Sequence, residues 1–306
     1  NFRQENKSNL LFDGGGHSVK DLYLDKNYIY LSYTKEQKED CYNTSIIRAK
    51  INLEYLIFED FFTYDECQSI NNDEYVAIQS GGRIEKRDES SIFFTIGDFR
   101  NRTLAQDYNS LFGKVLSINT NDASYTITSL GHRNPQGLYF DKNRDILFMT
   151  EHGPKGGDEF NINKQPNSKE IENYGWPISS YGKHYDGKVR EEAPLHNSHK
   201  KFGYIEPIKY YVPSIAISDI ENFNIYENYP KDNQFFIAAL GGNIDMGHMS
   251  LHHVVINDNM EKIIKSIIIP VNERIRDIKY IKEKKAIILM LETSPAIGIL
   301  NFSIVD

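Results

Sequence analysis

The sequence predicts an all-β protein assembled from the blades of a β-propeller. One pattern recurs five times: a strand-like segment, a short polar turn, and then a strongly aromatic or aliphatic strand. One or two further strand candidates follow each copy, so that a unit holds about four short strands, as a propeller blade does. Long stretches with helical periodicity are absent, which argues against an α/β barrel.

The strand pairs give the order of the blades along the chain. In this order they are 19–24 with 28–33, 82–84 with 91–98, 137–140 with 146–151, a first strand from residue 217 with 234–240, and 275–280 with 286–291. β-Branched and aromatic residues dominate the second strand of each pair, which is typical of buried strands. A β-sandwich is the main alternative, but it does not explain five similar units.

The remaining strands of each blade are weaker in the sequence. Segments 113–118 and 125–130 complete one blade, and 251–256 and 263–269 complete another. Residues 299–305 resemble the third strand of an incomplete last blade. Ring closure in propellers commonly borrows a strand from the opposite terminus, and residues 10–12 could supply it. We expect residues 1–306 to form a single propeller domain.

Composition excludes several classes of function. The chain of 306 residues has a net charge of −8 and scattered Lys and Arg residues, so a nucleic-acid surface is not expected. No run of 18 apolar residues is present, so no membrane span is expected. The polar N-terminus has no signal-peptide core and no initiating Met, which indicates a processed form or an excerpt. Cys41 and Cys67 could form one disulfide or remain two thiols, and their spacing supports no metal site.

The most informative stretch is the block of residues 131–177, which lies between predicted strands. It concentrates glycines, charged and amide side chains, and the only Trp of the chain. Ordering so many polar groups on a flexible backbone costs conformational entropy, so a bound ligand is the natural explanation. The alternative is a long Gly/Pro-rich loop with solvated charges.

Four arginines stand at the ends of predicted inner strands, where loops form the usual ligand site of a propeller. They are Arg83, Arg133, Arg274 and Arg276. Guanidinium groups bind carboxylates bidentately, so together they would attract a strongly anionic ligand. The alternative is that each is a surface arginine paired with a neighbour such as Glu273 or Asp277.

Two motifs in the central block suggest a hard cation. Glu151-His152-Gly153-Pro154 and Gly157-Asp158-Glu159 combine turn carbonyls with carboxylates, which are typical Ca²⁺ ligands. Solvated loop carboxylates are the alternative. His152 could bind a transition metal, but no second His or Cys stands at the spacing of a zinc site.

These motifs resemble the soluble pyrroloquinoline quinone (PQQ)-dependent glucose/sorbosone dehydrogenases and the related aldose sugar dehydrogenases. The strongest match is the central block, with Gly-His-Arg-Asn-Pro-Gln-Gly from residue 131, followed by Glu-His-Gly-Pro, Gly-Gly-Asp-Glu and Asn-Tyr-Gly-Trp-Pro in the family's order. Weaker matches are Gly81-Gly82-Arg83, Thr95-Ile96-Gly97-Asp98, Ala105-Gln106-Asp107, residues 111–116, Pro213-Ser214-Ile215-Ala216 and residues 273–277. The resemblance extends from about Gly14 over nearly the whole chain.

The resemblance implies a six-bladed propeller with PQQ over the channel, of which this chain would lack most of the first blade. It implies oxidation of an aldose or similar alcohol at C1, by hydride transfer to the quinone, in the periplasm or outside the cell. The electron acceptor and the oligomeric state are not marked. The implied cofactor contacts are Arg133, Asn134, Arg274 and Arg276; the carbonyls of Gly153 and Pro154 would hold the catalytic Ca²⁺; and Glu159 and Tyr174 match the ligands of a second, structural Ca²⁺.

Two departures from the family pattern bear on catalysis. The family's general base, a His before the Gly-Gly-Arg element, is replaced by Gln79, and a glutamine amide accepts no proton at neutral pH. Gln79 and Arg133 would thus stand at the reaction centre without a base, unless His17 or His152 takes that role. A Lys or Arg that the family often places after a Leu is Gly241 here. The alternative is therefore a non-catalytic propeller that binds a ligand. A propeller lactonase is disfavoured because it needs carboxylates, rather than arginines, around the channel.

Overall fold

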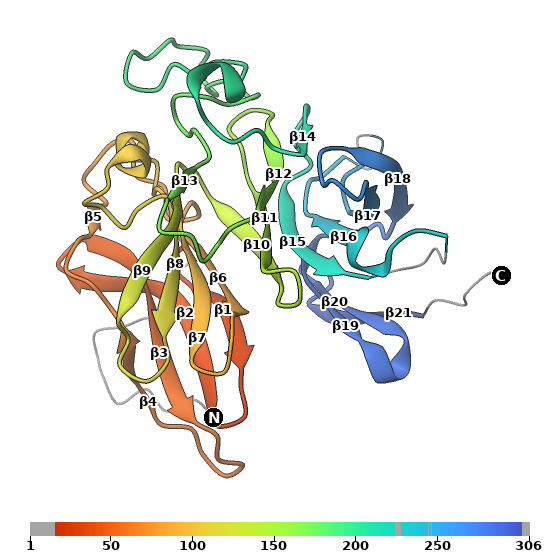
Figure 1. Ribbon diagram of the computed structural model, residues 1–306. Helices are drawn as coiled ribbons and strands as arrows, with labels where there is room; N and C mark the ends of the chain where they lie inside the picture. Colours follow the sequence, from red (N-terminus) through yellow and green to blue (C-terminus); the bar gives the residue numbers. More distant parts are fainter. Residues whose placement is uncertain (1–15, 224–227, 244, 246, 302–306) are drawn as a thin grey trace. The chain divides into compact units, whose positions relative to one another are not determined.

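The computed structural model describes residues 16–223, 228–243, 245 and 247–301. The chain divides into two compact units, residues 1–135 and residues 136–306. In the described residues of both units, antiparallel strands are joined by turns and loops, with short 3₁₀ turns at Arg102–Gln106, Lys200–Phe202, Lys231–Asn233 and Lys282–Lys284 (Figure 1).

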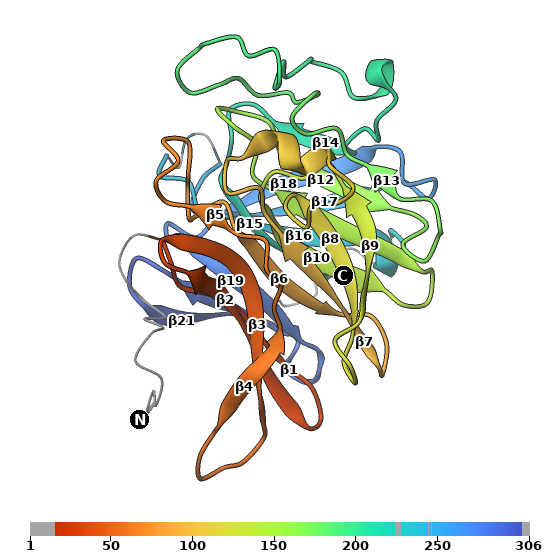
Figure 2. The same cartoon turned by 90° about the vertical axis from the view of Figure 1, so that its left-hand side faces the viewer.

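The first unit contains two antiparallel sheets, which Figure 2 shows from the side. The strands of the first sheet are β1 (Val19–Leu24), β2 (Tyr28–Lys38), β3 (Cys41–Lys50) and β4 (Phe58–Phe62), with the short β5 (Gln68–Ser69) paired to β3. The strands of the second are β6 (Gly81–Lys86), β7 (Ser91–Ile96), β8 (Lys114–Asn119) and β9 (Tyr125–Leu130).

The second unit contains three antiparallel sheets. The first has β10 (Pro135–Asp141), β11 (Ile146–Glu151), β12 (Asp158–Asn163) and β14 (Lys209–Tyr211). The second has β15 (Ile217–Asn222), β16 (Gln234–Ala239), β17 (Ser250–Ile256) and β18 (Ile263–Pro270). The third has β19 (Ile275–Ile281), β20 (Ala286–Leu291) and β21 (Ala296–Asn301). The short β13 (Glu172–Asn173) lies in the long connection from β12 to β14.

Each of the five sheets corresponds to one predicted blade, so the β-propeller class and its five recognisable blades are confirmed. The predicted third strand of the last blade is present as β21, which begins at Ala296 rather than at residue 299. The rest of that prediction, and the closing strand at residues 10–12, lie outside the described residues.

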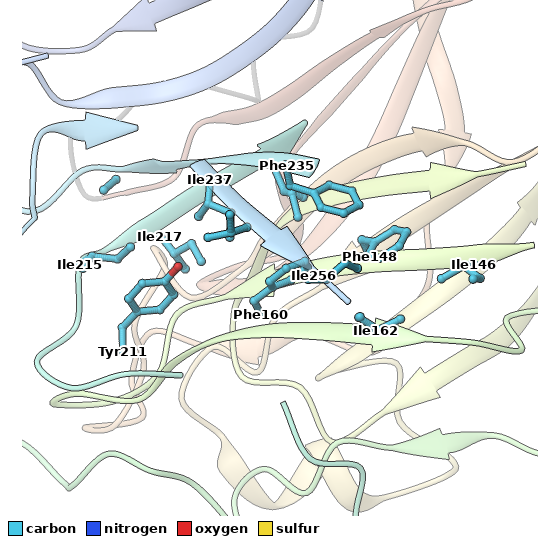
Figure 3. Close-up of a cluster of buried hydrophobic side chains, with 13 residues drawn as sticks. Ile146, Phe148, Phe160, Ile162, Tyr211, Ile215, Ile217, Phe235, Ile237 and Ile256 are labelled. Atoms are coloured by element: carbon cyan, nitrogen blue, oxygen red, sulfur yellow. The ribbon is translucent and has the colours of Figure 1, made fainter. Parts of the chain in front are cut away.

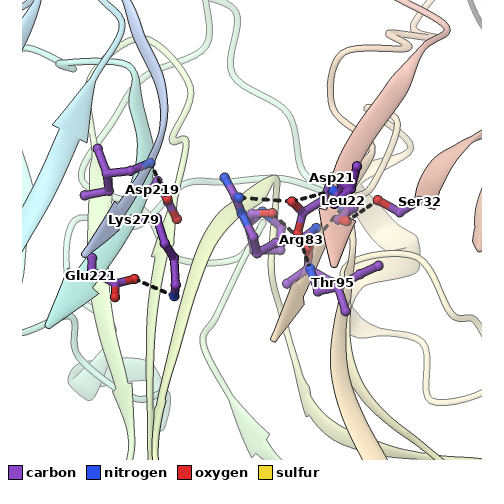
Figure 4. A network of polar contacts seen from close by, with 12 residues as sticks. Asp21, Leu22, Ser32, Arg83, Thr95, Asp219, Glu221 and Lys279 are labelled. Atoms are coloured by element: carbon purple, nitrogen blue, oxygen red, sulfur yellow. Dashed lines mark hydrogen bonds and ion pairs between the residues drawn. The ribbon is translucent and has the colours of Figure 1, made fainter. Parts of the chain in front are cut away.

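In each unit, the side chain of one aspartate joins two neighbouring blades by a hydrogen bond (Figure 4). In the first unit, Oδ2 of Asp21 on β1 accepts the backbone N–H of Ile84 on β6 at 2.7 Å. In the second, Oδ2 of Asp219 on β15 accepts the backbone N–H of Ile278 on β19 at 3.0 Å. Each aspartate lies at a register shift in its strand pair, and the bulge turns the carboxylate toward the next blade.

Buried aromatic rings fill the space between the sheets of each unit. In the second unit, the rings of Phe148 (β11) and Phe235 (β16) approach to 4.5 Å between centroids, and Phe160 (β12) packs edge-on against Phe235 (Figure 3). In the first, Phe94 (β7) and Phe112 belong to a similar cluster. These side chains come from the apolar second strands of the repeat and from the strands that follow them, which explains why the repeat was visible in the sequence.

Cys41 and Cys67 form a disulfide, so the first of the two alternatives left open by the sequence is the one realised. The bond ties the start of β3 to the residue before β5, where Cys41 and Ser69 are paired. It closes a segment with a sequence separation of 26 residues, which includes the exposed stretch around Leu53. Such a crosslink lowers the conformational entropy of the unfolded chain.

Candidate active-site clusters

Gln79 lies in a buried polar cluster of the first unit, together with Arg133 and Asp98. With the amide oriented by its hydrogen-bond partners, Nε2 of Gln79 donates to Oδ1 of Asp98 at 3.1 Å. Oε1 of the same amide accepts from Nη2 of Arg133 at 2.9 Å. All three side chains are almost fully buried. The amide therefore links a carboxylate to a guanidinium and fixes both in position.

The backbone around this cluster is equally constrained. The backbone N–H of Asp98 donates to the carbonyl of Arg133 at 2.9 Å, and Oδ1 of Asn134 accepts the N–H of Gly81 at 3.0 Å. The carbonyl of Gln79 accepts the N–H of Phe99 at 3.0 Å. A Cβ at Gly97 would overlap that carbonyl, so only glycine fits there. The structure thus brings Gln79, Arg133 and Asn134 together in one place.

Asp98 contacts Gln79, although the sequence motifs alone assigned it no role. It follows Thr95-Ile96-Gly97 at the end of β7, and its carboxylate holds the side chain at position 79. A carboxylate in that position is what orients an imidazole base. The structure thus has a carboxylate beside position 79, which is occupied by an amide. The place of Asp98 at the end of a matched motif was the signal that could have identified it.

The other candidates of the first unit have different partners. Nη1 of Arg83 pairs with Oδ1 of Asp21 at 3.3 Å, and both side chains are buried (Figure 4). Arg83 therefore helps Asp21 to join the first blade to the second. His17, a candidate replacement base, stacks on Tyr42 at 4.0 Å, and its Nε2 lies 2.7 Å from the hydroxyl of Tyr75.

In the second unit, Gly153 and Pro154 form part of a tight turn lined by carbonyl oxygens. The N–H of Gly153 donates to Oδ1 of Asp158 at 3.0 Å, and the hydroxyl of Ser214 donates to the carbonyl of Pro154 at 3.4 Å. A Cβ at Gly153 would overlap the carbonyls of Gly156 and Gly157, so the chain can pass here only with glycine. Backbone carbonyl oxygens are among the ligands that a hard cation such as Ca²⁺ takes.

Glu159 and Tyr174, the matched ligands of a second calcium, both contact His199. Nε2 of His199 lies 3.2 Å from Oε1 of Glu159, in an ion pair, and Nδ1 lies 2.9 Å from the carbonyl oxygen of Tyr174. Nδ2 of Asn161 bridges Oε2 of Glu159 and Oε1 of Glu151, at 3.1 Å to each. All these residues are buried.

Charge and burial act against each other in this cluster. Burial lowers the pKa of His199, but the adjacent Glu159 carboxylate, together with Glu206, outweighs burial and raises the pKa above its ordinary value. Burial raises the pKa of Glu159, while His199 lowers it, and the net direction is upward. Each nitrogen of the His199 ring thus faces an oxygen atom, that of the Glu159 carboxylate on one side and that of the Tyr174 carbonyl on the other.

Arg274 and Arg276 share one carboxylate. The distances to Glu292 are 3.5 Å from Nη2 of Arg274 and 2.5 Å from Nη2 of Arg276. Nη1 of Arg274 also donates to the carbonyl of Leu240 at 2.6 Å. More than a third of each guanidinium-bearing side chain is exposed, so both can also bind an anionic ligand.

His248 explains the loss of a basic side chain at Gly241. A Cβ built at Gly241 would overlap the His248 ring. Nδ1 of His248 accepts the N–H of Asn243 at 2.7 Å, and Nε2 lies 2.9 Å from the carbonyl of Ser214. The imidazole therefore fills the space into which a side chain at position 241 would project. Sequence analysis gave no sign of His248, because a ring packed on a glycine leaves no pattern.

In residues 16–223, 228–243, 245 and 247–301, no group of three or more His, Cys, Asp or Glu side chains is arranged to hold a metal ion. No helix in the same residues is long and apolar enough to cross a membrane.

Comparison with known proteins defines the class to which these blades and clusters belong. The family model for glucose/sorbosone dehydrogenase matches residues 15–297. The chain belongs to this family.

An aldose sugar dehydrogenase of Escherichia coli is 28% identical over 227 residues, which cover 69% of this chain and 58% of the relative. An uncharacterised protein of Synechocystis is 29% identical over 222 residues, covering 65% of this chain and 50% of the relative. Quinoprotein glucose dehydrogenase B of Acinetobacter calcoaceticus is 32% identical over 126 residues, covering 31% and 25%. The chain thus spans between a quarter and three fifths of the length of these relatives.

Solved structures agree on the fold. A crystal structure of a glucose dehydrogenase has a TM-score of 0.76 at 21% identity, over 94% of this chain and 84% of that one. The PQQ-bound form of an aldose sugar dehydrogenase from Streptomyces coelicolor has a TM-score of 0.64 at 20% identity, over 91% and 75%. At this identity, the likeness establishes the fold alone.

Proposed function

We propose that this chain provides the quinone site of a PQQ- and Ca²⁺-dependent dehydrogenase, which oxidises an aldose or similar alcohol at C1. The observation that carries the proposal is the buried guanidinium of Arg133, held by the Gln79 amide in a cluster that also contains Asp98 and Asn134. A buried arginine held by a neutral amide keeps its positive charge available to a ligand with anionic oxygens.

The donors on this chain fit both groups chemically. PQQ is a tricarboxylic quinone, and Arg133, Asn134, Arg274 and Arg276 supply the cationic and amide donors that its carboxylates and carbonyls would need. The carbonyls of the turn at Gly153 and Pro154 supply the oxygen ligands for Ca²⁺. When bound, the quinone would accept the hydride that leaves C1, and Ca²⁺ would polarise the quinone carbonyl.

The residues of the chain would have separate tasks in this reaction. Arg133 would hold the quinone and stabilise the negative charge that develops on it, and Asn134 would fix the adjacent backbone. The proton of the C1 hydroxyl must be removed as the hydride departs. Gln79 cannot take it, because both polar atoms of its amide are engaged and an amide is not basic. Proton removal would therefore fall to solvent or to the Asp98 carboxylate, and we expect slow turnover.

The second candidate is a propeller that binds the quinone or another anionic ligand without turning it over. The Gln79 amide favours this candidate, since the bonds to Asp98 and Arg133 give the cluster a stable arrangement that needs no base. Gly241 favours it as well, because His248 fills the position of the absent basic side chain.

Reconstitution separates the two candidates. The purified protein is mixed with PQQ and Ca²⁺, and dye reduction is assayed with a panel of aldoses. The dehydrogenase proposal predicts a spectral change of PQQ followed by dye reduction that depends on both additions. Binding without turnover would establish the second candidate. A PQQ spectrum that does not change on mixing would contradict both.

We also propose that the protein works in the periplasm or outside the cell. The disulfide between Cys41 and Cys67 supports this compartment, because such bonds persist in oxidising environments and are rare in the cytosol. Cell fractionation, followed by thiol labelling of the protein in each fraction, tests it: the disulfide-bonded form is expected in the periplasmic or secreted fraction.

A further inference from the structure

We propose that the imidazole of His199 takes the place of the second, structural calcium, so that Glu159 and the carbonyl of Tyr174 are joined by a side chain of the protein and bind no metal ion. The family resemblance assigns these two oxygens to a cation. The structure instead places one ring nitrogen of His199 against each of them. The proposal does not depend on quinone binding.

Geometry excludes simultaneous occupation by the ring and a shared ion. Ca²⁺ binds oxygens at about 2.3–2.6 Å, so two ligands of one ion must approach a common centre. Oε1 of Glu159 faces Nε2 of His199 at 3.2 Å, and the Tyr174 carbonyl faces Nδ1 at 2.9 Å. The two nitrogens point in different directions from the ring, which therefore stands between the oxygens. Calcium could join them only if the ring left.

The backbone of His199 is fixed in place by a second carboxylate. Oε1 of Glu206 accepts the N–H of His199 at 3.0 Å and the N–H of Lys200 at 2.8 Å. These bonds anchor the first residues of the turn at Lys200–Phe202, for which His199 is the N-cap residue. Oε2 of the same carboxylate accepts the hydroxyl proton of Tyr181 at 2.7 Å.

Aromatic stacking fixes the plane of the imidazole ring. The ring of Tyr181 stacks on His199 with centroids 5.4 Å apart and planes inclined by 17°. Tyr181 stacks in turn on Tyr210 at 3.7 Å. An imidazolium against the face of an electron-rich ring is favourable. The position of His199 is thus set by its ring contacts with Glu159 and Tyr174, by its backbone hydrogen bond to Glu206 and by stacking on Tyr181.

The charges around the ring are those expected of a cation site. Glu159 on β12 contacts the ring, and Glu206 accepts the backbone N–H of His199. Glu151 on β11 is joined to Glu159 through Asn161, and Glu172 accepts the hydroxyl proton of Tyr174 at 2.7 Å. The Oδ1 atom of Asn161 is buried without a hydrogen-bond partner beside these carboxylates. In this acidic, oxygen-rich pocket, the His199 ring occupies the space between Glu159 and Tyr174 in which a shared cation would lie.

Calcium-dependent thermal stability tests the proposal on the full chain, purified without quinone and treated with a chelator. In the wild type, 1–5 mM Ca²⁺ should move the midpoint by no more than about 1 °C. The variant His199→Ala should unfold at a lower temperature and regain about 2–4 °C with Ca²⁺, because the vacated pocket then binds the ion. The double variant His199→Ala/Glu159→Gln should regain nothing.

His253→Ala is the matched control. His253 is a buried histidine of the same unit on β17, and it lies near Phe236 rather than among carboxylates. Its removal should lower the midpoint without any gain from Ca²⁺. Tb³⁺ luminescence, excited through the tyrosines, should be stronger in His199→Ala than in the control, and His199→Ala/Glu159→Gln should lose this additional signal.

Two results would overturn the proposal. One is a rise in the wild-type midpoint with Ca²⁺ that Glu159→Gln abolishes, since calcium would then bind Glu159 with His199 present. The other is a folded His199→Ala that gains neither stability nor Tb³⁺ luminescence. A wild-type rise that persists in Glu159→Gln places the ion elsewhere and agrees with the proposal.

If His199→Ala does not fold, NMR of the wild type labelled with ¹⁵N-histidine decides the question. The ring signals of His199, assigned with His199→Gln, should stay unchanged when Ca²⁺ is added. A change in these signals on addition of Ca²⁺ would contradict the proposal.

Discussion

The cluster around Gln79 and the cluster around Glu159 differ from the family resemblance in the same way. In each, the surrounding residues are those that the resemblance implies, but the group at the centre is a different one. In the first, Asp98 and Arg133 hold a neutral amide where a base is expected. In the second, Glu159 and the Tyr174 carbonyl hold an imidazole where a metal ion is expected.

The two differences would affect different properties of the protein. At position 79 an amide, which gains no proton, stands where the resemblance implies a base, so we expect the site to keep its shape and to turn over slowly. At His199, our proposal puts a side chain of the protein where the resemblance implies a metal ion, so the stability of this cluster would no longer depend on calcium. The first difference thus bears on catalysis and the second on stability.

The largest expected effect is that of Gln79→His on turnover. An imidazole at position 79 would find Asp98 in place to orient it, and a positioned base contributes a factor of about 10²–10⁴. Dye reduction by the protein loaded with PQQ and Ca²⁺ should rise by that factor. Gln79→Asn is the control, because it changes the side chain without supplying a base. Adding Asp98→Asn to Gln79→His should remove most of the gain, and an undiminished rate would show that Asp98 does not orient the base.

The next effect concerns the stability of the second cluster. Glu159→Gln leaves the His199 cation buried without its carboxylate, which should lower the free energy of unfolding by about 3 kcal/mol. Glu221→Gln is the matched control, because Glu221 is buried but its partner Lys279 is largely exposed (Figure 4). That change should cost at most about 1 kcal/mol. Urea unfolding measures both, and equal losses would mean that the Glu159–His199 pair is no stronger than a surface pair.

A pH experiment sharpens the contrast between two buried histidines. Burial lowers the pKa of His253 to about 4, whereas the pKa of His199 is raised by its carboxylates. A base whose pKa is lower in the folded state destabilises the fold as pH drops below its ordinary value of 6.5, because the unfolded chain then binds the proton more tightly. Between pH 7.5 and 5, His253 should therefore cost about 2 kcal/mol. His253→Leu should lose about 2 kcal/mol less unfolding free energy than the wild type over this pH range, as measured by urea unfolding. If the two proteins lost the same amount, His253 would not have the lowered pKa.

The smallest effect is expected at Gly241, where His248 fills the space beside the glycine. Gly241→Ala forces the new Cβ against the imidazole ring, and overpacking of this kind should cost about 1 kcal/mol. His248→Ala should make the same substitution neutral, which a double-mutant cycle of thermal midpoints can measure. Additive losses would mean that the two positions do not share the space.

The fold was largely predictable because its signals are local. The second strand of each blade is a short apolar run after a polar turn, and strands such as β7 and β16 are buried at every position. Boundaries were less certain, as the earlier start of β21 shows. The pairing of Cys41 with Cys67 could not be derived, because spacing alone does not distinguish a disulfide from two thiols.

The site was predictable only where a motif identified it. Gln79, Arg133 and Asn134 were found through matched motifs, and the structure brings them together. His199 was not found, because it lies in a long irregular connection and becomes adjacent to Glu159 only through the fold. His248 was missed because its packing on Gly241 leaves no pattern in the sequence. The roles of Gly153, Pro154, Arg274 and Arg276 in binding remain predictions.

The central claim is that the cluster around Gln79 can still bind the cofactor and lacks only a base. The affinity for PQQ at saturating Ca²⁺, compared between the wild type and Gln79→His, tests this claim most directly. If the claim holds, absorbance titration should give dissociation constants that agree within about threefold, since a factor of three is less than 1 kcal/mol. The two proteins should then differ in turnover alone. A wild type that fails to bind PQQ while Gln79→His binds it tightly would contradict this, because the amide would then have cost the site its ligand as well as its base.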